Sequence, residues 1–238
     1  MYNHDMPNKS YQIRVCNSCG LRYPLTEGHS FGMRCPICMG DTHLTLRVTR
    51  KLILEPTRPL ASTDLTANHS TLSGTHPKRS PTGVLREGGL AVLLDNIRSA
   101  WNVGSIFRSA DGFGLAHAYL CGITPTPEIE AVTKTSLGAE DAVTWSYHKD
   151  ALKLVNGLKK EGWKILALEE NERAISISHV SSARLNENTV LIVGNEVTGV
   201  DPELLDLADE IFYIPMQGEK KSFNVAMAFS IAAYALNT

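Results

Sequence analysis

Residues 190–196 read VLIVGNE: four consecutive apolar residues, then a glycine, an amide and a carboxylate. A short apolar run rich in β-branched residues and ended by a turn signal predicts a strand buried on both faces of a sheet. A similar run, LAVLL, occupies residues 90–94. Strands of this kind are typical of parallel sheets covered by helices, so the two segments predict an α/β fold.

Short apolar runs alternate with helical patterns from residue 90 onward, which predicts an open, mostly parallel sheet with helices on both faces. The expected strands are residues 90–94, 118–122, 143–147, 163–168, 190–193 and 211–215. The expected helices are one capped by Asn102, then residues 128–137, 150–160, a short helix opened by Asp201 and Pro202, and residues 224–236. The pattern does not assign residues 171–187.

The first 88 residues differ in composition from the rest. Residues 55–88 are rich in Pro, Ser, Thr, Gly and Asn, which predicts a linker between a small unit, residues 1–54, and a larger one, residues 89–238. Up to residue 88 there are 11 Lys+Arg against 6 Asp+Glu, and after it 12 against 19. A basic unit tied to an acidic one suggests a polyanionic partner, but an ordinary solvated surface explains the charge equally well.

Four cysteines form two close pairs in the small unit, Cys16 with Cys19 and Cys35 with Cys38. Two residues within each pair let both thiolates reach one ion, so the spacing predicts a structural zinc ribbon with four sulfur ligands. A rubredoxin-like iron site is the minor alternative. Two disulfides would need an oxidising compartment, and the polar start of the chain lacks the apolar region of an export signal, so we expect a cytoplasmic protein.

Two familiar phosphate-binding motifs are excluded. Residues 112–114 read GFG but end a helix and lack the third glycine of a dinucleotide fingerprint. Residues 218–222 read GEKKS and lack the glycine directly before the lysine of a P-loop. No apolar stretch is long enough to span a bilayer, so we expect no membrane partner.

Three turns at the carboxyl ends of predicted strands remain as candidates for the site: residues 102–110, 194–199 and 214–224. Open α/β sheets bind ligands at this edge. In the first turn, Gly104 and Arg108 are four residues apart, so we expect the glycine to clear space beside an arginine whose planar guanidinium suits phosphate. Taken one at a time, each residue has another explanation. Arg108 suits a surface ion pair, Glu196 suits a turn, and Asn224 suits a helix cap.

Taken together, the three turns resemble the SpoU/TrmH family of the SPOUT methyltransferases. The family pattern N-x-G-x-x-x-R falls on residues 102–108, G-N-E-x-x-G on residues 194–199, and I-P-M-x-G-x-x-x-S-L-N-V on residues 214–225, with Phe223 in place of the usual leucine. The match begins at about residue 90 and leaves the ribbon and linker outside.

The resemblance implies methylation of a ribose 2′-hydroxyl in tRNA or rRNA with S-adenosylmethionine, on a sheet that ends in a trefoil knot. It places cofactor contacts at Gly194, Ile214, Met216, Phe223 and, at the end of its strand, Leu168. It makes Arg108 the catalytic residue, as a phosphate clamp or as the proton acceptor. Since guanidinium stays protonated at ordinary pH, we favour the clamp. The remaining site residues, which would orient Arg108 and the ribose, are Asn102, Glu196, Ser222 and Asn224.

Further expectations concern partners. The last helix is apolar nearly all round, so we predict a homodimer that covers it, as the resemblance also implies; a central helix in a monomer is the alternative. We expect tRNA in preference to rRNA, because compact family members often act there. We assign the ribbon to RNA binding, with a stabilising role as the alternative. Within the site, we expect Glu196 to hold the Arg108 guanidinium. An RNA-binding protein without turnover and a methyltransferase for another substrate are the competing functions.

Overall fold

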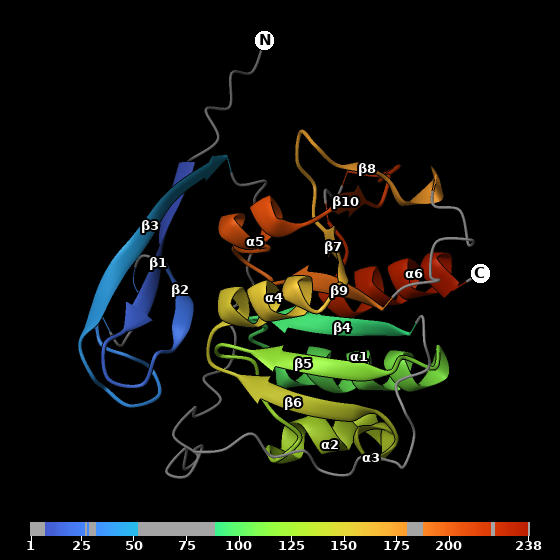
Figure 1. Ribbon diagram of the computed structural model, residues 1–238, viewed down its shortest axis with the longest axis horizontal. Coiled ribbons are helices and arrows are strands. Elements are labelled where there is room, and N and C mark those ends of the chain that lie inside the picture. Colours follow the sequence, from blue (N-terminus) through green and yellow to red (C-terminus); the bar gives the residue numbers. More distant parts are fainter. Residues whose placement is uncertain are drawn as a thin grey trace.

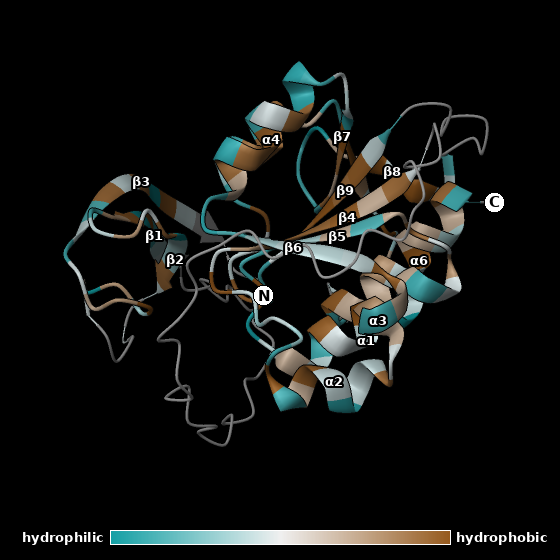
Figure 2. Ribbon diagram, turned by 60° about the horizontal axis from the view of Figure 1, so that its bottom comes forward, coloured by the Kyte–Doolittle hydropathy of each residue, from teal (hydrophilic) through white to brown (hydrophobic). Residues whose placement is uncertain are grey.

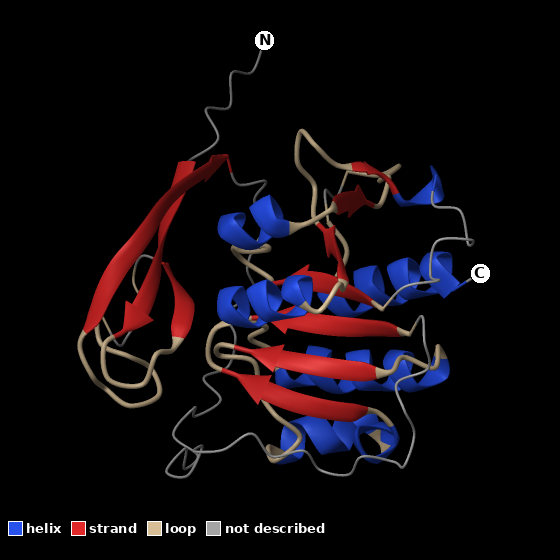
Figure 3. Cartoon of the chain, in the orientation of Figure 1, coloured by secondary structure: helices blue, strands red, loops and turns tan. Residues whose placement is uncertain are grey.

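The computed structural model describes residues 8–26, 28, 32–51, 89–179, 188–219 and 222–237 (Figure 1). The expected linker, residues 55–88, lies outside the described residues. The described chain forms a small N-terminal sheet and a larger sheet with helices packed on both of its faces (Figure 3).

The small sheet is built over residues 8–51 from β1 (Asn8–Cys16), β2 (Arg22–Thr26) and β3 (Thr42–Lys51), antiparallel and in the order β2-β1-β3. Its core is a cluster of Cys16, Leu21, Tyr23 and Cys35. So small a core buries too little apolar surface to hold a fold by itself, so this unit needs a further source of stability.

The larger sheet has, in the described part of the chain, seven strands in the order β6-β5-β4-β9-β7-β10-β8, and each neighbouring pair is parallel. The strands are β4 (Leu90–Asp95), β5 (His117–Cys121), β6 (Thr144–His148), β7 (Lys164–Leu168), β8 (Ile175–Ser176), β9 (Thr189–Gly194) and β10 (Glu210–Tyr213). This arrangement confirms the predicted α/β fold. The expected knot stays a prediction.

Helices cover both faces of this sheet (Figure 2). One face carries α1 (Ala100–Gly112), α2 (Glu130–Ser136), α3 (Ala139–Ala142) and α6 (Val225–Asn237), whose apolar side chains pack with Val92 and Leu94 of β4. The other face carries α4 (Ala151–Lys160) and α5 (Pro202–Leu207), which pack with Ala91 and Leu93. A short 3₁₀ helix, η1 (Ile177–His179), follows β8. The alternation along β4 gives the sheet two cores because successive side chains point to opposite faces.

The start of one helix was predicted wrongly. Helix α1 begins at Ala100 and is capped by Ser99, whose side chain accepts from the Asn102 backbone N–H at 3.4 Å, so Asn102 is not the cap. The expected helix at residues 128–137 is confirmed as α2, which ends where Leu137 and Gly138 take left-handed conformations with φ of 53° and 94°; α3 follows it. The predicted cap at Asp201 is confirmed, since its side chain accepts from the backbone N–H of Glu203 at 3.0 Å.

Gly104 was expected to clear space beside Arg108. It is instead buried where α1 meets α2. A Cβ atom at this position would lie 2.5 Å from the carbonyl oxygen of Val132 and 2.6 Å from Cβ of Thr135. The glycine therefore sets how closely the two helices approach.

The small sheet packs against the carboxyl-terminal ends of strands in the larger one, as Figure 1 shows at its left side. The backbone N–H of Arg22 donates to the carbonyl of Lys149, just beyond β6, at 2.9 Å. Its side chain is buried and donates from Nε to Oδ2 of Asp201 at 2.8 Å, and it also pairs with Glu203. The two units are therefore joined through a buried charged contact. Among the described helices, none is long and apolar enough to cross a membrane.

We expect Gly104→Ala to lower the free energy of unfolding by about 1–3 kcal/mol, because the added methyl group meets backbone of α2 that cannot yield cheaply. The matched control is Gly157→Ala in α4, where a Cβ would meet no atom within 4 Å. Alanine is the better helix former by about 0.5–1 kcal/mol, so this control should be stabilised. Urea unfolding of both variants measures the difference; equal stabilisation by the two would contradict the close contact of α1 with α2.

Candidate active site and cysteine cluster

The three candidate segments begin at one edge of the larger sheet, and the first of them, residues 102–110, belongs to helix α1 instead of the expected turn. They follow β4, β9 and β10, and in the sheet β4 lies beside β9 while β7 separates β9 from β10. Because the sheet is parallel, all of these strands end at the same edge. Segments that are far apart in the sequence are thereby brought together.

The carboxylate of Glu196 connects the turn after β9 to the start of α1. Its Oε2 accepts from the backbone N–H of Arg98 at 2.8 Å, and its Oε1 accepts from the backbone N–H of Ser99 at 3.0 Å and from Nδ2 of Asn102 at 2.8 Å. A negative charge at a helix N-terminus is favourable because unpaired backbone N–H groups gather there. The expectation that Glu196 holds the Arg108 guanidinium was therefore wrong for this structure.

Asn224 brings the third turn to the same place. Its Nδ2 donates to Oδ1 of Asn102 at 3.0 Å, and its own Oδ1 accepts from the backbone N–H of Ala226 at 2.9 Å, which caps α6. Glu196, Asn102 and Asn224 therefore form one hydrogen-bonded cluster from three predicted site segments. Ser222 lies exposed two residues before Asn224.

Arg108 lies outside this cluster. Its position on α1 is six residues after Asn102, which corresponds to about 9 Å along the helix axis and about 120° around it. The side chain is exposed, and within the described parts of the chain no hydrogen-bond or ion-pair partner holds its guanidinium. Helical side chains lean toward the N-terminus, so Arg108 leans toward the edge that carries the cluster.

The expected cofactor residues follow adjacent strands. Leu168 ends β7 and lies opposite Val193 in β9 and Phe212 in β10, so Gly194 and Ile214 come just beyond its two neighbours. Leu168 and Ile214 are half-buried against the core, Met216 is half-buried, and Phe223 is 38% exposed. Partly covered apolar side chains beside the backbone of a turn suit a ligand with an aromatic ring and a polar tail.

Local packing explains why residue 194 is a glycine. Asn195 and Gly199 form an antiparallel bridge that folds the turn back, and a Cβ at Gly194 would lie 2.2 Å from the backbone nitrogen of Val200. Only glycine fits beneath this turn, so the turn itself explains the residue. Its contact with a cofactor stays a prediction.

A buried polar network that was not predicted from the sequence lies beneath the cluster. Nδ2 of Asn195 donates to the carbonyl of Asn96 at 2.6 Å, and Nδ2 of Asn96 donates to Oδ1 of Asp95 at 2.7 Å. The signal was present, because Asp95 and Asn96 follow a buried strand directly, and Asn96 takes a left-handed φ of 58° that asparagine tolerates. Burial, and next the nearby negative charge of Asp201, raise the pKa of Asp95 to about 7, and Arg22 opposes that rise.

The four cysteines of the small unit form one cluster. Their Sγ atoms all lie within 4.8 Å of one another, with Cys16 and Cys38 at 3.4 Å and Cys19 and Cys35 at 3.7 Å. These separations are too long for disulfides, whose sulfur atoms are about 2.05 Å apart. They suit a tetrahedral metal ion with bonds of about 2.3 Å to each sulfur. The four sulfur atoms therefore fit zinc, and an iron ion would be held by the same four cysteines.

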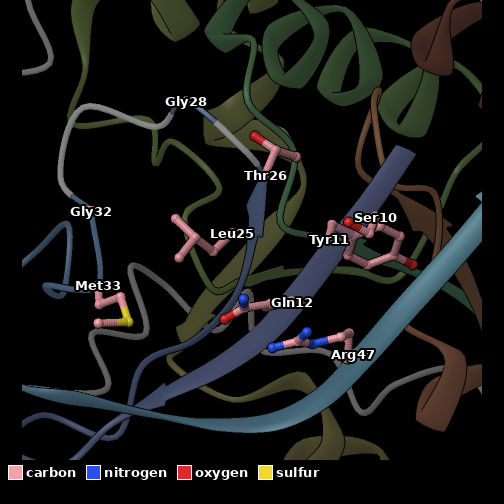
Figure 4. Close-up of a pocket in the computed structure, with 9 residues that line it drawn as sticks. All are labelled: Ser10, Tyr11, Gln12, Leu25, Thr26, Gly28, Gly32, Met33 and Arg47. Atoms are coloured by element: carbon pink, nitrogen blue, oxygen red, sulfur yellow. The ribbon is translucent and has the colours of Figure 1, made fainter. Parts of the chain in front are cut away.

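Two of the described arginines of the small unit are buried and so do not belong to an exposed basic patch. Arg14 is buried and donates to Gln12 and Thr42, and Arg22 is buried against Asp201. Arg34 is exposed but pairs with Asp41 at 3.1 Å. An exposed arginine, Arg47, lines a shallow depression of about 270 Å³ together with eight residues drawn in Figure 4. Arg14 and Arg22 are therefore not available to bind RNA phosphate.

Residues 89–234 match the SpoU rRNA Methylase family. The tRNA (guanosine(18)-2'-O)-methyltransferase of Escherichia coli (strain K12) is 28% identical over 149 residues, which are 63% of this chain and 63% of that protein. The Thermus thermophilus protein of the same name is 30% identical over 149 residues, 63% of this chain and 74% of that protein. The chain thus spans 63% of the length of the E. coli relative.

Solved structures give the same result. The chain is similar to the A. aeolicus TrmH/SpoU tRNA modifying enzyme, with 27% identity and a TM-score of 0.57 over 64% of this chain and 76% of that one. It is also similar to the AdoMet-bound rRNA methyltransferase from Sinorhizobium meliloti, with 25% identity and a TM-score of 0.59 over 64% of this chain and 57% of that one. The family match starts at residue 89 and so leaves the cysteine-bearing unit outside.

Proposed function

Because the chain belongs to the SpoU rRNA methylase family, we propose that it transfers the methyl group of S-adenosylmethionine to a ribose 2′-hydroxyl of RNA. The observation that carries this proposal is the cluster of Glu196, Asn102 and Asn224 at the edge where Leu168, Gly194 and Ile214 lie. The relatives named above are 2′-O-methyltransferases of tRNA. A relative that acts on 23S rRNA, from Bacillus subtilis, is 31% identical over 61% of this chain and 56% of that protein. We propose tRNA as the preferred substrate.

Five residues would hold the cofactor: Leu168, Gly194, Ile214, Met216 and Phe223. When bound, S-adenosylmethionine supplies a methyl group on a positively charged sulfonium. The half-buried side chains of Leu168 and Ile214 offer apolar surface, and the turn after β10 offers backbone donors and acceptors for polar groups. Phe223 replaces a leucine of the family pattern with a larger side chain that can cover an aromatic ring.

Arg108 would bind the phosphate beside the target ribose and stabilise the negative charge that develops on the 2′-oxygen. Its exposed guanidinium suits this role, because it has no competing partner among the described residues. The cluster would place the ribose: three donors already occupy the oxygens of Glu196, which therefore holds Asn102 in position. Asn102, Asn224 and Ser222 would contact the sugar.

We expect Arg108→Ala to lower kcat for RNA methylation by about 10²-fold or more, because it removes a group that stabilises developing charge. The charge-matched control is Lys160→Ala, at the far end of α4, which should leave kcat unchanged. Transfer of labelled methyl groups to tRNA and rRNA, with mass mapping of the 2′-O-methylated nucleosides, measures the rates.

The same assay separates the competing functions. A wild-type protein that binds RNA but methylates none would support the inactive alternative, and label appearing only in protein or in a small molecule would support another substrate. Wild-type transfer by Arg108→Ala would overturn the assignment of Arg108.

We also propose that Cys16, Cys19, Cys35 and Cys38 hold a structural zinc ion, which supplies the stability that the small core of this unit lacks. Reduced thiols of this kind persist in the cytoplasm, where we place the protein. A site with four protein ligands has no open position, so it takes no part in catalysis.

We expect about one zinc ion per chain in elemental analysis, and loss of zinc in Cys38→Ser, which removes one ligand. The control is Cys121→Ala, a buried cysteine outside the cluster, which should keep the metal. Iron in place of zinc would support the alternative metal, and full zinc content in Cys38→Ser would exclude the four-cysteine site.

We further propose a homodimer that packs through α6. Met227, Ile231 and Tyr234 are spaced along one face of this helix and are exposed by 58%, 36% and 60%. Trp101 of α1 is 60% exposed as well, and α1 is held beside α6 by a hydrogen bond between Ser109 and Ser230 at 2.7 Å. Apolar faces of this kind mark association surfaces. Arg108 lies seven residues after Trp101 on the same side of α1, so the interface would lie next to it.

We expect Met227→Asp to shift the protein from dimer to monomer in sedimentation velocity, because a charge would be buried in the interface. The control is Leu137→Asp, which places the same charge on a side chain exposed by 70% between α2 and α3. A wild-type monomer, or a dimer that tolerates Met227→Asp, would contradict this interface.

A further inference from the structure

Arg22 is a residue of the small unit whose side chain is enclosed by the large one. Only 6% of it is exposed, and its two carboxylate partners, Asp201 and Glu203, stand at the start of α5. On the side of its own unit, Nη1 reaches Oγ1 of Thr45 in β3 at 3.5 Å. A desolvated arginine in a two-carboxylate contact fixes position and direction, because its donors lie in one rigid plane.

From Asp201 a chain of hydrogen bonds leads to the candidate active site. The backbone N–H of Asp201 donates to Oδ2 of Asp95 at 2.9 Å, and Oδ1 of Asp95 accepts from Asn96 at 2.7 Å. The carbonyl of Asn96 accepts from Nδ2 of Asn195 at 2.6 Å. Asn195 directly precedes Glu196, which holds Asn102 and the start of α1.

Asn195 also sets the shape of the turn that carries Glu196. Its Oδ1 accepts from the backbone N–H groups of Val197 at 2.8 Å and Thr198 at 3.1 Å. The turn is thus fixed at Asn195 and again at Asp201. Asp201 is bonded directly to the buried carboxylate of Asp95, and Asn195 is connected to that carboxylate through Asn96.

Two carboxylates lie close together here without access to water. Asp95 is 2% exposed and Asp201 5%, and the charge of Asp201 is among the causes that raise the pKa of Asp95. The groups that face Asp95 are Asp201, Arg22 and the thiol of Cys121, and of these Arg22 alone is positive. Removing the arginine would leave two buried acidic groups facing each other, which favours protonation of one of them or displacement of the turn.

We propose that Arg22 is a positioning residue for methyl transfer, which makes the N-terminal unit a structural part of the active site. Through Asp201 and Asp95 it holds residues 195–201 so that Glu196 stays bound to the start of α1. This inference rests on the proposed function. It assigns the unit a role that needs no RNA contact, in agreement with the burial of Arg14 and Arg22.

The test compares Arg22→Gln with Arg34→Gln in the full-length, metal-loaded protein. Arg34 is the matched control, because it is an arginine of the same unit whose ion pair with Asp41 is exposed. We expect Arg22→Gln to lower kcat at least tenfold, to leave KM for RNA within twofold, and to keep its zinc. Arg22→Lys should recover part of kcat, since it restores the charge without the planar guanidinium.

Amide hydrogen exchange without RNA gives an independent measurement. We expect exchange to accelerate at residues 96–99 and 195–201 in Arg22→Gln and to stay unchanged there in Arg34→Gln. The pH profile of kcat should move as well: without Arg22 the pKa of Asp95 rises further, so activity that needs its ionised carboxylate is lost at a higher pH on acidification.

Asp201→Asn guards against a variant that fails to fold. It removes the same ion pair but keeps an oxygen that can cap α5. Because it also removes one of the two buried acids, we expect a smaller loss of kcat than in Arg22→Gln, and no greater loss in the double variant than in Arg22→Gln alone. A higher KM at unchanged kcat in Arg22→Gln would overturn the proposal and indicate RNA binding by this arginine. Unchanged exchange at residues 195–201 would overturn it too. If the wild-type protein methylates no RNA, the proposed function fails, and the exchange data still decide whether Arg22 holds the turn.

Discussion

The carboxylate of Glu196 is the contact on which the candidate active site depends. It accepts from two backbone N–H groups at the start of α1 and from the side chain of Asn102. A single side chain in the turn that follows β9 therefore fixes the helix that follows β4. Because Asn224 is bonded to Asn102, the start of α6 is fixed as well. A parallel sheet makes this possible, since it delivers the ends of distant strands to one edge. The close contact of α1 with α2 at Gly104 also holds α1 in its position.

Burial decides what the charged side chains of the N-terminal unit can do. An arginine can bind RNA phosphate only where solvent reaches it, and Arg14 and Arg22 are enclosed by hydrogen-bond partners. The excess of positive charge in this unit suggested a polyanionic partner. Part of that charge belongs to Arg14 and Arg22, which stabilise the fold. Among the described side chains of this unit, Arg34 and Arg47 stay exposed, and Arg34 is paired with Asp41.

Six strands of the larger sheet and most helices followed from sequence because their signals are local. Apolar runs placed β4 and β9 to within a residue or two, and Asp201 with Pro202 marked the start of α5. The errors also have local causes. Asn102 looked like a cap, but Ser99 stands directly before the first turn of α1, and Asn102 lies within that turn. In residues 171–179, the described part of the segment that the pattern did not assign, the only strand is β8, which contributes Ile175 and Ser176 to the edge of the sheet.

By itself the sequence determined the α/β class, the four-cysteine cluster and the segments that meet at the sheet edge, because periodicity, thiol spacing and turn residues act over a few positions in the chain. Only the tertiary structure decided which polar groups pair within that edge. Glu196 binds Asn102 and backbone instead of Arg108, and Arg22 meets Asp201 across a sequence separation of 179 residues. Such pairings depend on how two packed units exclude water from particular charges, which no local pattern records.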